Sequence, residues 1–91
     1  MQVPDNVVSG AVTCDGAVKQ LPDVPCRMVY LQAKTGNSGA VVVGGSTVAS
    51  GVNGVVLAAG TVFPVAILVD NLKRLYVFGA NNDVLHYMVC R

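Results

Sequence analysis

The stretch VVLAAGTVFPVAILV, residues 55–69, has no charged position and lies inside an uncharged run from Thr35 to Val69. This hydrophobicity raises a choice between a membrane span and the strands of a β domain. A spanning helix needs about 20 consecutive apolar residues, and Gly60 and Pro64 interrupt this run. We therefore expect no membrane segment. The N-terminus has no basic region ahead of an apolar one, so we also expect no signal peptide.

The composition of the whole chain favours strands. Valine supplies twenty of the 91 residues, glutamate is absent, and ten glycines and four prolines cut the chain into strand-length pieces. A helical protein would draw on Glu, Lys, Leu and Ala for its exposed positions. The chain therefore predicts a single all-β domain over residues 1–91, a small antiparallel β-sandwich or β-barrel of about eight short strands. Residues 1–6 are expected to form a flexible N-terminal arm.

The expected strands follow apolar alternation and the positions of turn residues. The clearest is CRMVYLQA, which has one face apolar enough for a core and one mixed face. Residues 61–69 predict one long strand or a bent pair with two apolar faces, so the second face must meet a second sheet, a loop or another subunit. Gly44 and Gly45 predict the end of a strand. The expected ranges are 7–13, 17–20, 26–33, 40–43, 47–49, 55–58, 61–69, 75–79 and 84–90, and the last two are expected to form a C-terminal hairpin.

The chain carries more apolar residues than its size can bury. Hydrophobic residues make up 53% and charged residues 12%, against usual values of roughly 45–50% and 25%. A domain of this length hides only about 60–65% of its unfolded surface, so we expect some apolar surface to contact a partner. The net charge is +1 and the basic residues are scattered. This distribution argues against a nucleic-acid partner and against a polybasic membrane patch.

The residues that usually carry chemistry form no recognisable site. Cys14, Cys26 and Cys90 lack metal-ligand spacing and His86 is the single histidine, so we expect no metal and no cofactor. His86 and Cys90 lie two alternations apart on one expected strand, too far for a nucleophile and its base. We predict a protein that is not an enzyme, with buried free thiols, assembled inside a cell. The aspartates are expected to be solvated turn residues: Asp5, Asp15, Asp23, Asp70 and Asp83.

Four segments, VPCRMVYLQA, GNSGAVVVGGSTVA, NGVVLAAG and FPVAILVDNLKRLYVFG, occur in this order over roughly Pro25 to Gly79. The order resembles a group of small virion proteins of tailed bacteriophages. In that group a strand ending in LQA is followed by a G-N-x-G turn, a strand ending in GG and a final D-x-L-x-x-L/I-Y-V-x-G strand. The resemblance implies a capsid decoration, or cement, protein on the capsid exterior of a virion that assembles in the bacterial cytoplasm. It brings no catalytic residue.

The partners implied by the resemblance are the major capsid protein and the protein itself, as a homotrimer. We expect the subunit contact to use residues 62–68 and the C-terminal hairpin, because closed symmetry also protects sheet edges. The candidate interface residues are Val62, Phe63, Pro64, Val65, Ile67, Leu68, Leu85 and Tyr87.

Two other functions stay open at this point. A tail- or fibre-associated module that binds a host glycan would use aromatic residues with Asn or Asp beside them, and residues 76–82 with Tyr87 are the candidates. A small enzyme or ligand-binding barrel would need acid and base groups that the sequence does not show.

Overall fold

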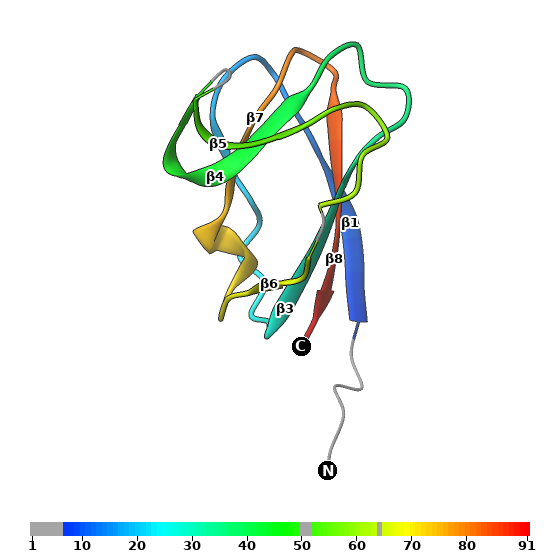
Figure 1. Cartoon of the computed structure of the whole chain (residues 1–91). Coiled ribbons are helices and arrows are strands. Elements are labelled where there is room, and N and C mark those ends of the chain that lie inside the picture. Colours follow the sequence, from blue (N-terminus) through cyan, green and yellow to red (C-terminus); the bar gives the residue numbers. More distant parts are fainter. Residues whose placement is uncertain (1–6, 50–51, 64) are drawn as a thin grey trace.

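The computed structural model describes residues 7–49, 52–63 and 65–91. The chain forms two antiparallel sheets of four strands each, with orders β1-β8-β3-β6 and β2-β7-β4-β5, which face each other as a small β-sandwich (Figure 1). The predicted all-β class is confirmed. The predicted arm and Pro64 lie outside the described residues. The elements are β1 (Val7–Thr13), β2 (Lys19–Gln20), β3 (Met28–Ala33), β4 (Val41–Ala49), β5 (Val52–Leu57), β6 (Ile67–Leu68), the 3-10 helix η1 (Leu72–Arg74), β7 (Tyr76–Phe78) and β8 (Val84–Cys90).

The connections between strands build the sandwich. Only β4 and β5 follow each other in the chain and also pair in a sheet, whereas every other connection between described strands crosses to the opposite sheet. The predicted C-terminal hairpin is therefore wrong. β7 lies between β2 and β4, and β8 lies between β1 and β3. At the turn ANND, residues 80–83, the chain crosses from the second sheet to the first. β7 and β8 therefore bury their apolar faces against each other's sheets and do not share a ladder.

The core lies between the sheets and takes one face of each long strand. Along β3, Val29, Leu31 and Ala33 are buried, and the residues between them face outward. The register with β8 sets Val29 beside Val89 and Ala33 beside Leu85, and all four side chains are fully buried. The second sheet adds Val41, Val43, Leu57 and Val77, and the connections add Cys14, Leu21, Cys26, Leu72 and Leu75.

The predicted break in the strand after Val43 is wrong. β4 runs through Gly44 and Gly45 to Ala49, and Gly44 pairs with Gly54 on one side and with Tyr76 on the other. At Gly54, the pairing partner of Gly44, glycine allows close packing, since an added Cβ atom would lie 2.6 Å from the carbonyl oxygen of Val43 and 2.8 Å from two valine side chains. Gly54 therefore serves for close approach inside a ladder, whereas a Cβ atom on Gly45 would meet nothing within 4 Å.

The segment from Thr61 to Val69 runs along β3 as two short pieces, which matches the bent pair among the two predicted forms. Val62 bridges Gln32, and after an interruption β6 pairs with the start of β3. Within the described part of the chain only one face of this segment is covered, so cover of the other face by another subunit stays a prediction. Val62 and Leu68 are 56% and 77% exposed, because the segment lies at the edge of the sheet and only its inner face meets the opposite sheet.

A buried polar clasp ties the turn after β3 to the start of β8. Asp83, only 3% exposed, accepts hydrogen bonds from the Ser38 amide (2.8 Å), the Ser38 hydroxyl (3.0 Å) and the Gly39 amide (3.2 Å). Asn37 exchanges two hydrogen bonds with the backbone of Val84. The predicted solvated role is therefore wrong for Asp83, which satisfies backbone donors that the crossing between sheets would otherwise leave unpaired.

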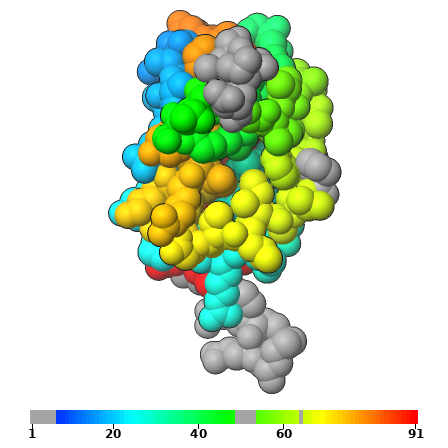
Figure 2. All heavy atoms as spheres, turned by 60° about the vertical axis from the view of Figure 1, so that its left-hand side comes forward, coloured from blue at the N-terminus to red at the C-terminus, as the bar shows by residue number. Residues whose placement is uncertain are grey.

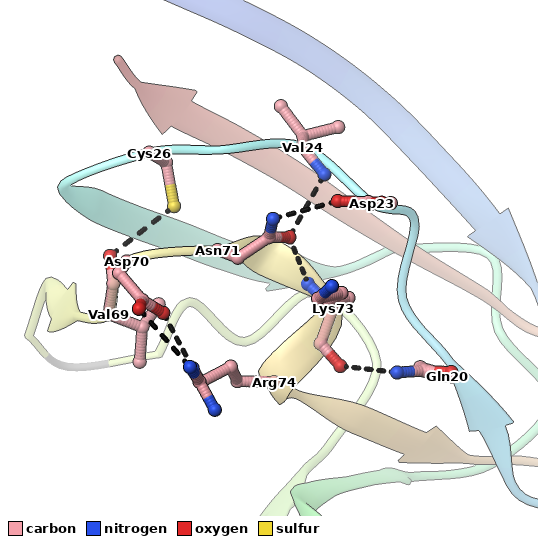
Figure 3. Close-up of polar contacts among 9 residues, drawn as sticks. All are labelled: Gln20, Asp23, Val24, Cys26, Val69, Asp70, Asn71, Lys73 and Arg74. Carbon is pink, nitrogen blue, oxygen red and sulfur yellow. Dashed lines mark hydrogen bonds and ion pairs between the residues drawn. The ribbon is translucent and has the colours of Figure 1, made fainter.

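A second polar cluster holds the corner that follows β6 (Figure 3). The side-chain oxygen of Asn71 accepts from the amides of Val24 (3.1 Å) and Lys73 (2.9 Å), and its amide group donates to Asp23 (2.7 Å). Asn71 caps the 3-10 helix η1. In Figure 2, η1 (gold) lies beside the yellow segment that contains β6. The corner thus fixes where β6 meets β3.

We predict that Leu85→Ala lowers the free energy of unfolding by about 2–5 kcal/mol, because the removed atoms leave a cavity in a closed core. Urea denaturation of both forms measures this loss. The matched control is Leu68→Ala, an equal truncation at an exposed site, which should change stability by less than about 0.5 kcal/mol in dilute solution. Equal losses in the two variants would contradict the assignment of Leu85 to the core.

A second prediction concerns pH. Hydrogen bonds from the Ser38 amide, above all, hold the pKa of Asp83 below its ordinary value of 3.8. Because the folded-state pKa is lowered, the stabilisation is complete above the unfolded pKa and is lost as pH falls through the folded one. Urea midpoints should therefore decline as pH falls below the ordinary carboxyl pKa of 3.8. Asp83→Asn should start from a lower midpoint and lose less over this range, and an unchanged slope in that variant would contradict the role of the clasp.

Candidate interaction surface

The outer face of the first sheet has no charged side chain on its strands. Pairing partners in an antiparallel sheet project to the same side, so the outward residues form rows across β1, β8, β3 and the edge segment. The rows are Val7, Cys90, Met28 and Leu68; Ser9, Met88 and Tyr30; Ala11, His86, Gln32 and Val62; and Thr13 and Val84. We call these positions the uncharged face.

Large apolar side chains on the uncharged face are open to solvent. Leu68, Val62 and Val7 are more than half exposed, and Met88 and Tyr30 are 42% and 40% exposed. They come from all four strand positions of the sheet, so they form one contiguous surface. Contiguous apolar patches of this kind usually mark contacts with other proteins, whereas apolar residues scattered singly over a surface are ordinary.

A shallow hollow of about 240 Å³ lies on this face. Tyr30, Met88 and Val62 contribute apolar walls, and Gln32 and His86 contribute polar groups. The hollow sits where Val62 bridges β3, beside the point at which the edge segment is interrupted. An apolar side chain of a partner, with one polar neighbour, would fit this combination of apolar walls and hydrogen-bonding groups.

The structure separates the predicted interface residues into three groups. Val62 and Leu68 lie on the uncharged face, and Val65 is 64% exposed in the bend between them. Phe63 and Ile67 are partly buried and pack against the core. Leu85 is fully buried, so its predicted place in a subunit contact is wrong: the register sets it on the inner face of β8.

Tyr87 also points to the inner side of the first sheet, where its ring covers Gly10 of β1. Tyr76, the other aromatic considered for a glycan site, belongs to the second sheet. It borders a hollow of about 300 Å³ together with Gln20, Ser46, Lys73 and Arg74, between η1 and β4. The two tyrosines therefore do not contribute to one glycan site.

The cysteines are free thiols, as predicted, although only Cys14 and Cys26 are buried and Cys90 is half-buried on the uncharged face. Burial raises the pKa of the Cys14 and Cys26 thiols, and nearby negative charge adds to this effect. His86 and Cys90 lie on one face of β8 with Met88 between them. Within the described ranges, no group of three or more His, Cys, Asp or Glu side chains is arranged to hold a metal ion.

Within the described residues, no helix has the length and hydrophobicity needed to cross a membrane. Comparison of the chain with protein-family models, with curated proteins and with solved structures finds no match.

The candidate residues chosen from the sequence omitted several members of the uncharged face, although the expected subunit contact included the C-terminal strand. Tyr30, Gln32, Met88 and His86 alternate with core residues on β3 and β8, and the strand pattern alone shows that they share a face within each strand. Pairing between segments more than fifty residues apart decides which face of each strand turns outward. The same pairing places the outward faces of β3 and β8 side by side. A mixed, uncharged second face on two strands was the available signal.

The reactivity of the cysteines tests the placement of Cys90 on the uncharged face and of Cys14 and Cys26 in the interior. We predict that a thiol reagent such as 5,5′-dithiobis(2-nitrobenzoate) modifies one cysteine rapidly in the native protein, because the raised pKa and burial of Cys14 and Cys26 keep them protonated and covered. The Cys90→Ser variant should lose this fast phase and keep its fold by circular dichroism. A fast phase that persists in Cys90→Ser would place the exposed thiol elsewhere.

Proposed function

We propose that this protein is a non-enzymatic virion structural protein that decorates a bacteriophage capsid and stabilises it by bridging neighbouring major capsid proteins. The uncharged face is the observation that carries the proposal. The order of segments between residues 25 and 79 supports the choice of partner, because it resembles small phage virion proteins. The all-β sandwich agrees with what that resemblance implies for the fold.

The physical role of the face follows from its composition. The centres of protein interfaces are depleted in charged residues and rich in aromatic residues and Met, and Tyr30 and Met88 occupy the middle row of this face. Burying such a surface removes apolar area from water without stranding a charge. Polar contacts then come from Gln32 and His86, which border the hollow.

Stabilisation of a capsid needs no chemical step. A protein that binds the assembled shell and not its separated subunits shifts the equilibrium toward the shell by mass action. One molecule that contacts two neighbouring capsid subunits makes their separation cost the free energy of its own binding. A rigid sheet face suits this task, because little conformational entropy is lost when it binds.

The second candidate is a tail- or fibre-associated module that attaches to a host glycan. The observation that favours it is the hollow beside Tyr76, where one aromatic ring lies with Gln20, Ser46 and two basic residues. This hollow is on the second sheet, away from the uncharged face. Tyr76→Ala should abolish glycan binding if this function holds, and should leave capsid attachment intact if the first one does.

Co-sedimentation with capsids that lack the protein tests the proposed function. The double variant Val62→Lys, Leu68→Lys places two ammonium groups on the uncharged face, and we expect at least a tenfold weaker attachment together with loss of the added heat resistance of the capsid. Val56→Lys is the control, because Val56 is about as exposed as Val62 but belongs to the second sheet. Wild-type protein that stays in the supernatant at every concentration would overturn the proposal.

A further inference from the structure

Among the described residues, β1 has a strand neighbour on one side only and so forms an open edge of the first sheet. It ends the strand order of that sheet, it has seven residues, and its sequence VVSGAVT contains no charge and no proline. Natural sheets usually protect such an edge with a charged side chain, a proline, a bulge or a very short strand. The other edges in the described structure use two of these devices: β2 and β6 have two residues each, and β5 follows a register shift in β4.

The hydrogen-bond pattern shows which groups of β1 face outward. The amide of Cys14 donates to Asp83 of the turn before β8, and the carbonyls of Val84 and Cys90 accept from the side of β3. Because an antiparallel ladder alternates, Val8, Gly10 and Val12 bond to β8. The backbone groups of the alternate residues Val7, Ser9, Ala11 and Thr13 then point away from the sheet. The Nζ of Lys19 donates a hydrogen bond to one of these carbonyl oxygens, that of Thr13, at 3.0 Å.

The outward groups are symmetric about Gly10. Consider a second β1 strand related by a two-fold axis that passes between the Gly10 residues of the two copies. It would run antiparallel, with Ser9 opposite Ala11 and Val7 opposite Thr13 of the second copy. Each pair would exchange backbone hydrogen bonds, except where Lys19 holds the Thr13 carbonyl. The paired side chains are small or β-branched and uncharged, so neither copy repels the other across the seam.

Tyr87 supplies an independent reason for a second copy at this edge. Its ring reaches across β1 to Gly10, where its hydroxyl oxygen would lie 2.5 Å from an added Cβ atom. The ring stays only partly buried, since β1 is the last strand of the sheet. Two-fold pairing centred on Gly10 brings the rings of both copies together on the inner side of the seam and covers them. A bulkier residue at position 10 would displace the ring that this contact needs.

We propose that two copies of the protein join through β1, in antiparallel register centred on Gly10, and form one continuous eight-stranded sheet. The two-fold axis runs perpendicular to the sheet, so the uncharged faces of both copies point the same way and make one extended surface. This pairing does not depend on the capsid function. The homotrimer expected from the sequence was placed on residues 62–68 and the C-terminal hairpin and shares Tyr87 with this contact, but it has a different mass, so one measurement distinguishes the two assemblies.

The test is the molar mass of the full chain by size-exclusion chromatography with light scattering over a range of concentrations. We expect twice the monomer mass of 9.4 kDa. Ala11→Pro removes an outward amide without taking a bond from β8, and Ser9→Lys brings two ammonium groups to diagonal positions at the seam. Each should raise the dimer dissociation constant at least tenfold, whereas Val56→Lys on the other sheet should not change it.

Amide hydrogen exchange gives a second readout that does not rely on any variant. The Ser9 and Ala11 amides should be protected at high concentration and exchange rapidly on dilution, while the Val8, Gly10 and Val12 amides stay protected in both conditions. A monomer or a trimer at all concentrations, or a dimer in which Ser9 and Ala11 exchange rapidly, would overturn the pairing. Loss of capsid attachment with an intact dimer would contradict the proposed function alone.

Discussion

The register between β3 and β8 is the constraint on which the rest of this structure depends. It sets Val29 beside Val89 and Leu31 beside Tyr87, and so turns one face of both strands toward the opposite sheet. Side chains alternate with a period of two, so a slip of one residue would carry the core valines into solvent and bury Tyr30 and Met88 instead. The same pairing therefore creates the core and the uncharged face together, and neither can change without the other.

Crossing between the sheets creates a need for hydrogen bonds that the ladders cannot meet. Almost every connection leaves one sheet for the other, which exposes backbone groups at the ends of the sandwich. Asp83 and Asn37 supply acceptors and donors at one end, and Asn71 does so at the corner after β6. Among the described residues, no buried side-chain nitrogen or oxygen atom lacks a hydrogen-bond partner. These few polar residues hold the edges of the sheets in the positions that the uncharged face requires.

An excess of apolar residues in so small a domain has one structural outcome here. The core between the two four-stranded sheets takes one face of each strand. In the second sheet Val42 and Val48 are also buried, and both side chains lie close to Gly54. The first sheet has no such cover among the described residues. Its outer face adjoins the β1 edge, where Lys19 is bonded to the Thr13 carbonyl, so the proposed second copy and the proposed capsid partner would use different surfaces.

The sequence by itself determined the strand content and the two-residue alternation, because these depend on local composition and on the period of side chains along a strand. β1 and β8 match their expected ranges for this reason. Tertiary structure alone decided that Gly44 and Gly54 stay within a ladder, that β7 and β8 lie in different sheets, and that Leu85 is inside while Leu68 is outside. Each of these outcomes depends on which distant segment pairs with which, and an apolar residue carries the same local signal on either face of its sheet.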